Sequence, residues 1–257
     1  MTKDRSVNSP SLIVGATAAL VSARSTAAVT TPVKAVNIVL VHGLFADGSS
    51  WSEVIARLQA AALNVTAVQN PLTTLRDAVA STERVLARQD GPTVLVAHSF
   101  AGMIVTEAGT HPNVSALVYV AGAAPDVGEN YAVLGKGYPA PPLMAGIVFD
   151  GDEGRLSENA FLRDLAGDVP VAKARVLYAV QGSFDETLLA DKATQVAWRS
   201  KPSFYAVSTE DRSLNPGLQR FLAKRMEAKA IELKSSHLSL ISHPDEVAGL
   251  IIQAAGH

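Results

Sequence analysis

The chain has 257 residues, 48% of them hydrophobic and 18% charged, a composition that supports a sizeable buried core and argues against a disordered chain. Its formal net charge of -2, with both signs interspersed, offers no basic stripe for a phosphate backbone, so we expect no nucleic-acid partner. The sequence contains no cysteine, which excludes disulfide bonds, a thiolate nucleophile and a cysteine-ligated zinc site.

Residues 1–33 have a pattern that does not suggest part of a folded domain. Lys3 and Arg5 precede an apolar stretch from Leu12 to Val21, and small residues follow it. This order is typical of a secretory signal peptide, and the apolar stretch is too short to span a bilayer. We therefore expect a signal-like segment that is dispensable for catalysis, a periplasmic or secreted protein, and no stable membrane insertion. A disordered extension on a cytoplasmic protein is the alternative.

Residues 34–257 alternate between strand-like and helix-like blocks, the pattern of one α/β domain whose mostly parallel sheet carries helices on both faces. Short apolar, β-branched runs such as 36–41 indicate strands that are buried on both faces. The expected strands cover residues 36–41, 65–68, 93–97, 114–120, 203–208 and 231–233, and the expected helices cover 50–62, 74–88, 99–109, 216–228 and 244–255.

The alternation stops from about residue 125 to 197, where several prolines break the chain. Short helical patterns occur there around 157–167, 170–180 and 185–191. We interpret this segment as a helical cap insertion that lies over the carboxyl edge of the sheet.

A serine at a strand-to-helix junction is the first candidate for catalysis. In the segment Val-Leu-Val-Ala-His-Ser-Phe-Ala-Gly, Ser99 has the small residues Ala97 and Ala101 two positions before and after it. A turn this tight tolerates only small side chains at those positions and raises the serine hydroxyl above the sheet, where a nucleophile is needed. The common motif has glycine at both positions, so this chain keeps the size constraint and departs from the strict motif. A helix-capping serine is the alternative interpretation.

The segment His-Gly-Leu-Phe at 42–45 ends the first core strand at the same edge of the sheet as Ser99, because parallel strands have their carboxyl ends on one side. A loop at this edge can direct a backbone N–H at the oxyanion that acyl transfer creates. We assign the two N–H donors to Leu44 and to Phe100, the residue after the serine. His42 stands in the wrong place to be a catalytic base, and we interpret it as a structural histidine that fixes the loop.

When a nucleophilic serine lies at a strand-to-helix junction of this kind, the acid follows it in the sequence and the base histidine follows the acid. His237 lies in a loop directly after the last strand, whereas His111 is about 15 Å from Ser99 along the intervening helix. His243 precedes a proline at a helix start and His257 ends the chain, so neither is suited to the role. The sequence therefore predicts His237 as the base.

Two neighbouring carboxylates are candidates for the acid. The segment Thr-Glu-Asp-Arg follows the strand 203–208, and a side chain there can reach Nδ1 of His237. We choose Asp211, with Glu210 as the alternative. A buried carboxylate at this point would hold the imidazole in the correct tautomer and stabilise the imidazolium that forms when Ser99 loses its proton.

These motifs resemble those of the α/β-hydrolase superfamily, and within it the small bacterial esterase-like proteins related to plant methylesterases and hydroxynitrile lyases. The resemblance runs from Val36 to Ala255, and its most specific parts are residues 41–51, 97–102, 198–205, 209–212 and 235–239. It implies an α/β-hydrolase fold and places the nucleophile, the acid, the base and the oxyanion donors on Ser99, Asp211, His237, Leu44 and Phe100. Plant hydroxynitrile lyases carry a lysine directly after the base histidine, where this chain has Leu238, and this difference argues against lyase chemistry.

The expected function is hydrolysis of a small to medium carboxylic ester through an acyl-enzyme intermediate, with no cofactor and no metal. A hydroxynitrile-lyase-like enzyme and a non-catalytic ligand receptor of the same fold are the alternatives. The ester is the expected small-molecule partner, and the sequence does not determine the oligomeric state. We expect the substrate pocket to be lined by Phe45, Tyr131, Tyr138, Met144, Ile147, Phe149, Phe161 and Leu238, for which ordinary packing between cap and core is the alternative.

Overall fold

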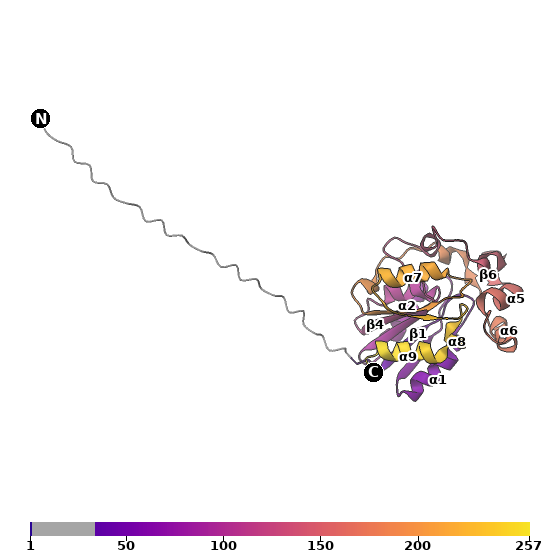
Figure 1. Ribbon diagram of the computed structural model, residues 1–257, viewed down its shortest axis with the longest axis horizontal. Helices are drawn as coiled ribbons and strands as arrows, with labels where there is room; N and C mark the ends of the chain where they lie inside the picture. The colour runs from indigo at the N-terminus through magenta and orange to yellow at the C-terminus, as the bar shows by residue number, and fades with distance from the viewer. Residues whose placement is uncertain (2–33) are drawn as a thin grey trace. The chain divides into compact units, whose positions relative to one another are not determined.

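Six parallel strands form the central sheet of the computed structural model, which describes Met1 and residues 34–257. The expectation of a signal-like segment therefore lies outside the described residues. The strand order is β2-β1-β3-β4-β8-β9 (Figure 1). The strands are β1 (Asn37–Val41), β2 (Asn64–Val68), β3 (Thr93–His98), β4 (Val114–Val120), β8 (Ser203–Ser208) and β9 (Lys229–Leu233).

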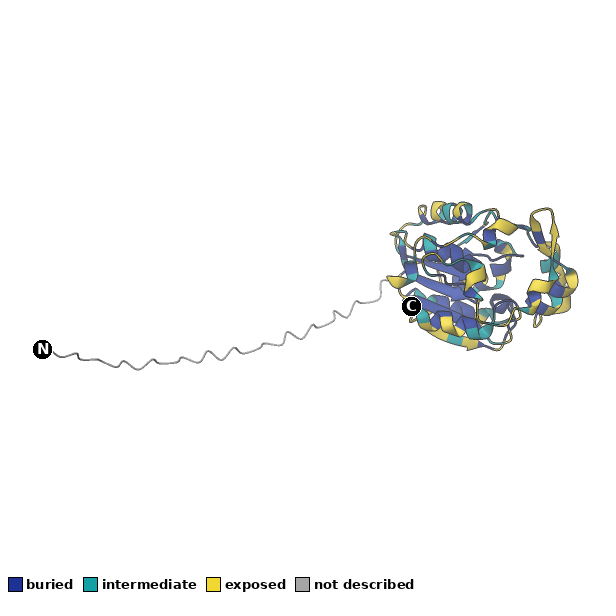
Figure 2. Cartoon of the chain, turned by 90° about the horizontal axis from the view of Figure 1, so that it is seen from above, coloured by how far each residue is buried: buried dark blue, intermediate teal, exposed yellow. Residues whose placement is uncertain are grey.

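Burial of the sheet explains the sequence pattern of its strands. Every residue of β1, β3 and β8 is buried, whereas the edge strands β2 and β9 are partly exposed. Figure 2 shows these inner strands enclosed between layers whose outer sides are exposed. A strand that is covered on both faces has no solvent-facing positions, which is why the inner strands appear in the sequence as continuous apolar runs rather than as alternating ones.

Helices cover both faces of the sheet, which confirms the expected α/β architecture. Helix α1 contacts α8 and α9 on one face, while α2 contacts α3 and α7 packs on β8 on the other face (Figure 1). The first group is α1 (Ser52–Ala60), α8 (Ser239–Ser242) and α9 (Pro244–Ala254), and the second is α2 (Leu75–Leu86), α3 (Ala101–Ala108) and α7 (Pro216–Arg225).

The insertion between β4 and β8 contains short helices and also a small sheet that the sequence analysis did not anticipate. The antiparallel strands β5 (Ile147–Asp150), β6 (Glu153–Leu156) and β7 (Phe184–Asp185) pair in the order β5-β6-β7. Around them lie α4 (Tyr131–Leu134), α5 (Glu158–Ala160), α6 (Val171–Ala179), the π-helical turn η3 (Phe161–Leu165) and the 3-10 turns η2 (Pro142–Gly146), η4 (Glu186–Leu189) and η5 (Ala197–Arg199).

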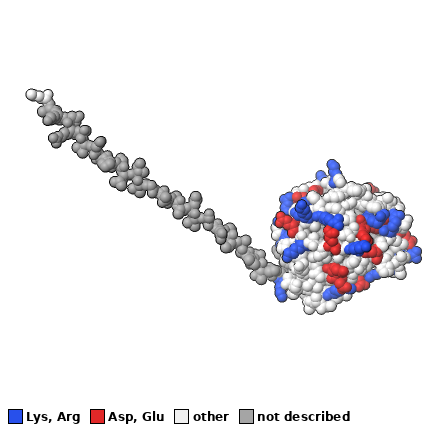
Figure 3. All heavy atoms as spheres, in the orientation of Figure 1, with Lys and Arg blue, Asp and Glu red and all other residues white. Residues whose placement is uncertain are grey.

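Charged side chains of both signs are mixed over the molecular face that Figure 3 shows. Several of them form ion pairs at the surface, such as Arg220 with Glu232 at 2.7 Å. Within residues 34–257, no helix combines the length and the apolar character that a membrane crossing requires. In the same part of the chain, no group of three or more histidine, aspartate or glutamate side chains is arranged to hold a metal ion.

Candidate active site

Ser99 lies in a strained turn between β3 and α3. Its φ angle is 58°, in the left-handed region that a residue with a side chain rarely adopts. The turn is fixed because the Ser99 carbonyl accepts hydrogen bonds from the N–H groups of Gly102 and Ala123, both at 3.0 Å. Helix α3 begins at Ala101, after Phe100, and no side chain caps its first turn, so the interpretation of Ser99 as a helix cap is wrong. The turn instead directs the hydroxyl towards His237.

The loop after β1 packs directly against Ser99. A Cβ atom added to Gly43 would lie 2.7 Å from the Cβ of Ser99 and 2.9 Å from the carbonyl oxygen of His98, so the close approach requires glycine. Among the described residues, no main-chain hydrogen bond of a turn, loop or cap uses the N–H of Leu44 or of Phe100. These two amides are therefore free to donate to a group bound beside Ser99.

His237 connects the serine to a carboxylate. Its Nε2 atom lies 2.7 Å from Oγ of Ser99, and its Nδ1 atom lies 2.6 Å from Oδ2 of Asp211. The imidazole is almost completely buried, and so is the carboxylate. Glu210, the alternative acid, is exposed at the surface and lies 3.8 Å from Lys234. The structure thus brings together Ser99, His237 and Asp211 from three separate loops at the carboxyl edge of the sheet.

The orientation of Asp211 depends on a glutamine that the sequence analysis missed. Oδ1 of Asp211 accepts hydrogen bonds from the N–H groups of Ser213 and Leu214, and Oδ2 accepts one from the side-chain amide of Gln219 at 2.7 Å. The amide oxygen of Gln219 in turn accepts from the N–H of Ser208, the last residue of β8. The sequence does contain an indication of this role. Gln219 lies with Leu222 on the buried face of α7, and such a face is usually apolar.

His98, the residue before the serine, supports the base and was also missed. Its Nε2 atom donates a hydrogen bond of 3.0 Å to the backbone carbonyl of His237, and the two rings lie 4.8 Å apart between centroids. Burial, together with the nearby His237, holds the pKa of His98 well below its ordinary value. His98 is therefore a neutral support for the loop that carries His237.

His42 fixes the neighbouring loop, as the sequence analysis expected of a structural histidine. Its Nε2 atom accepts a hydrogen bond from the N–H of Asn70 at 3.0 Å, and its Nδ1 atom lies 2.9 Å from the carbonyl oxygen of Gly43. Burial lowers the pKa of His42, so the ring stays neutral and donates to Gly43.

A small apolar chamber lies beside the Ser99 hydroxyl. Its volume of about 20 Å³ leaves room for about one water molecule. Four of the residues expected in the substrate pocket line this chamber, namely Phe45, Tyr131, Met144 and Ile147. Any molecule larger than water must therefore displace lining side chains to enter, and Met144, at 43% exposure, has the most freedom to move.

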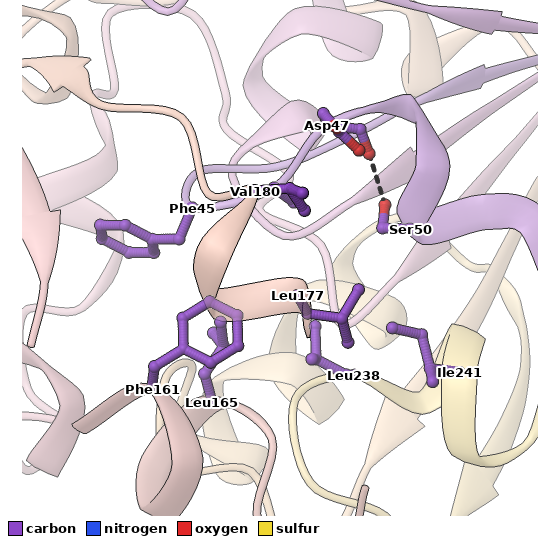
Figure 4. A pocket seen from close by; sticks show the side chains of 10 residues that line it. Phe45, Asp47, Ser50, Phe161, Leu165, Leu177, Val180, Leu238 and Ile241 are labelled. Atoms are coloured by element: carbon purple, nitrogen blue, oxygen red, sulfur yellow. Dashed lines mark hydrogen bonds between the residues drawn. The ribbon is translucent and has the colours of Figure 1, made fainter. Parts of the chain in front are cut away.

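The other expected pocket residues lie around this chamber. Tyr138 lines an adjoining groove of about 540 Å³. Phe161 and Leu238 line a second, narrow apolar pocket that Phe45 shares (Figure 4). Phe149 is half exposed on β5 and packs on the ring of Phe184.

The insertion is tied to both loops that carry the partners of Ser99. Asp164 has a fully buried side chain and accepts hydrogen bonds from Arg163 at 2.6 Å and from Arg212 at 2.7 Å. Arg212 directly follows Asp211. Ser236, which directly precedes His237, donates to the carbonyl of Leu165 at 3.2 Å and also contacts Asp168.

This arrangement has the chemical capacity for acyl transfer. A hydroxyl, an imidazole and a carboxylate form a continuous hydrogen-bonded chain, and the chamber beside the hydroxyl is also lined by Leu44, whose amide has no turn, loop or cap partner among the described residues. The imidazole can remove the hydroxyl proton, and the buried carboxylate can stabilise the imidazolium that results.

The sequence over residues 38–250 matches the alpha/beta hydrolase family, so the chain belongs to the α/β-hydrolase family. The membership expected from the motifs is thereby confirmed. No curated protein sequence matches the chain significantly.

Solved structures with the same fold include three hydrolases. Polyneuridine aldehyde esterase is 22% identical with a TM-score of 0.75, and the match covers 86% of this chain and 99% of that chain. A pyrethroid hydrolase from Sphingobium faniae JZ-2 is 20% identical with a TM-score of 0.72, covering 86% and 97% of the two chains. A methylesterase from Arabidopsis is 18% identical with a TM-score of 0.70, covering 85% and 98%. At these identities the likeness shows a shared fold.

Proposed function

We propose that this protein is a serine hydrolase that cleaves small to medium carboxylic esters through an acyl-enzyme intermediate. The observation that carries the proposal is the buried chain of hydrogen bonds from Ser99 through His237 to Asp211, with distances of 2.7 and 2.6 Å. Similar structures are those of an esterase and a methylesterase, which supports an ester as the substrate class.

In the first half of the proposed reaction, Nε2 of His237 takes the Ser99 proton while Oγ forms a bond to the ester carbonyl carbon. The carbonyl oxygen becomes an oxyanion that accepts hydrogen bonds from the N–H groups of Leu44 and Phe100. His237 then gives the proton to the alkoxy oxygen, the bond from that oxygen to the acyl carbon breaks, and the alcohol leaves. The acyl group remains on Ser99.

In the second half, a water molecule replaces the alcohol. His237 takes a proton from the water as its oxygen attacks the acyl carbon, and it returns a proton to Oγ when the acyl–serine bond breaks. The carboxylic acid leaves and Ser99 is regenerated. The carboxylate of Asp211 takes up no proton and stabilises the imidazolium in both halves of the reaction.

The direct test is the variant Ser99→Ala with p-nitrophenyl acetate and p-nitrophenyl butyrate as substrates. We expect kcat/KM to fall by about 10³-fold or more with an unchanged melting temperature, because the variant removes the nucleophile and little packing. Ser239→Ala is the matched control, since Ser239 is buried nearby and, within the described part of the chain, its hydroxyl has no hydrogen-bond partner. Equal hydrolysis by Ser99→Ala and Ser239→Ala would reject Ser99 as the nucleophile, whereas the absence of hydrolysis by the wild type would favour a receptor.

We further infer that the signal-like residues 1–33 direct the protein to the periplasm or out of the cell. The basic start, the apolar stretch and the small residues after it support this proposal. Expression of the full chain followed by mass spectrometry of the protein outside the cytoplasm tests it. Mature protein that begins within or just after this segment is the expected result, and full-length protein confined to the cytoplasm would contradict it.

A further inference from the structure

Tyr131, at the start of α4 in the insertion, is held directly over the turn that carries Ser99. The residue before it, Asn130, caps α4 by accepting a hydrogen bond of 2.9 Å from the N–H of Val133. The Tyr131 ring packs against the ring of Phe100, with 5.6 Å between the ring centroids. Two independent contacts thus fix both the backbone and the ring of this tyrosine.

The side chain of Tyr131 lines the chamber beside Ser99, and a hydrogen bond with the Ser99 side chain lowers the pKa of its phenol against the larger raising effect of burial. Two other buried tyrosines direct their hydroxyls to structural partners instead. Tyr119 pairs with Thr106 at 3.0 Å, and Tyr205 donates to the carbonyl of Gly122 at 2.6 Å. In contrast to these, Tyr131 shares its chamber with the proposed nucleophile.

Tyr131 also stands where the inner chamber meets the outer groove. The chamber beside Ser99 and the groove of about 540 Å³ share the residues Tyr131, Met144 and Ser213. The alcohol is the first product to leave in the proposed reaction, while the acyl group stays on Ser99. A departing alcohol that moves from the chamber to the groove therefore passes the side chain of Tyr131.

We propose that Tyr131 is a catalytic residue whose hydroxyl donates a hydrogen bond to the alkoxy oxygen that leaves the tetrahedral intermediate. The proposal rests on the ester hydrolysis proposed above. The hydroxyl turns to the alkoxy oxygen beside Ser99 when the intermediate forms. His237 still supplies the proton, and Tyr131 stabilises the negative charge that develops as the bond from carbon to oxygen breaks.

The environment of the phenol suits a donor. Burial raises the pKa of Tyr131, and the charge of Asp211 raises it further, so the phenol keeps its proton at neutral pH. A phenolate in this position would repel the developing alkoxide, whereas the neutral phenol supports it.

The test compares Tyr131→Phe with the wild type on two acetates that differ in their leaving group. p-Nitrophenyl acetate has a good leaving group that needs little stabilisation, and ethyl acetate has a poor one. We expect kcat/KM for ethyl acetate to fall by about tenfold to a hundredfold in Tyr131→Phe, and kcat/KM for p-nitrophenyl acetate to fall by less than about threefold. Tyr119→Phe is the matched control, because it removes a buried phenol hydroxyl away from the site and should affect both esters equally.

Two outcomes overturn the assignment. Unchanged hydrolysis of ethyl acetate in Tyr131→Phe would show that the hydroxyl does not participate, and an equal loss with both esters would show that it acts elsewhere than on the leaving oxygen. A fluorophosphonate that labels Ser99 in the wild type and in Tyr131→Phe establishes that the nucleophile is intact in both. If the wild type neither reacts with this probe nor hydrolyses either ester, the proposed function itself fails, which is a separate result.

Discussion

The two carboxylate oxygens of Asp211 have different hydrogen-bond partners, and this difference predicts the effect of substituting Asp211. Oδ2 holds His237, whereas Oδ1 accepts from the backbone of the following turn. Asp211→Asn places an amide opposite Nδ1 of His237, disfavours the required tautomer, and should lower kcat by about 10³- to 10⁴-fold. Glu210→Gln, at the exposed neighbouring position, should change kcat by less than about twofold. Steady-state kinetics of the two variants decide this, and a larger loss in Glu210→Gln would contradict the choice of acid.

The turn that carries Ser99 depends on one close backbone contact. A Cβ atom added to Gly102 would lie 1.7 Å from the carbonyl oxygen of Ala123, so a side chain there must displace the backbone. We expect Gly102→Ala to reduce the free energy of unfolding by about 2 kcal/mol or more. Gly249→Ala is the control, since nothing lies within 4 Å of its added Cβ in helix α9.

In urea unfolding, the control should gain about 0.5 to 1 kcal/mol, because alanine favours a helix interior more than glycine does. A Gly102→Ala variant as stable as the wild type would show that the turn has more freedom than its contacts indicate.

At the scale of residues, the sequence predicts those site residues whose position follows from the order of strands and loops. It does not predict the site residues that reach the site through packing between elements. Ser99 and Asp211 follow strand ends, and His237 is the histidine left in a loop after the last strand. Gln219 looks like a polar interruption of a helix pattern, and its role appears only when α7 packs on β8. The place of Tyr131 beside Ser99 likewise depends on how the insertion folds back, which no periodicity encodes.

At the scale of elements, the π-helical turn η3 links the insertion to the loop after β8. Arg163, and then Arg212, hold the pKa of Asp164 below its ordinary value. A carboxyl whose pKa is lowered by folding stabilises the folded state when it is ionised, and this contribution is lost as the pH falls through the folded pKa. The contribution of Asp164 to the free energy of unfolding should therefore be complete at neutral pH and decrease below about pH 4.

The variant Asp164→Asn tests this link. We expect a loss of about 1 to 2 kcal/mol in the free energy of unfolding at pH 7, smaller than for a fully buried ion pair because both guanidinium groups are about half exposed. Asp152→Asn, an exposed acid of the same insertion, should change stability by less than about 0.5 kcal/mol. Unfolding measured at pH 7 and near pH 3 checks the claim, and a difference between wild type and Asp164→Asn that grows on acidification would contradict it.

The central sheet could be predicted at the level of elements because its buried strands leave a strong pattern, whereas the small sheet of the insertion could not. Strand β5 is only four residues long and mostly exposed, and its sequence Ile-Val-Phe-Asp does not alternate between apolar and polar residues. The turn after it does carry a signal, since Gly151 has a φ of 61° within the segment Asp-Gly-Asp, a composition typical of hairpins. The expected helix at 185–191 is instead a short strand followed by a 3-10 turn, because tertiary pairing with β6 overrides the local pattern.

At the scale of the whole molecule, the fold brings together groups that are distant in the chain. The serine and the histidine are separated by 138 residues, and the histidine and the carboxylate by 26, yet all three meet above one edge of the sheet. The insertion closes over them from the outside and contributes Tyr131, Met144 and Ile147 to the chamber. A covalent cycle at Ser99 is the function that this convergence supports best.

Reaction of the full chain with a fluorophosphonate, followed by mass spectrometry of the digested protein, tests this claim most directly. We expect one equivalent of adduct on the peptide that contains Ser99, and its loss in His237→Ala. An unlabelled wild-type protein, or an adduct on another residue with Ser99 unmodified, would contradict it.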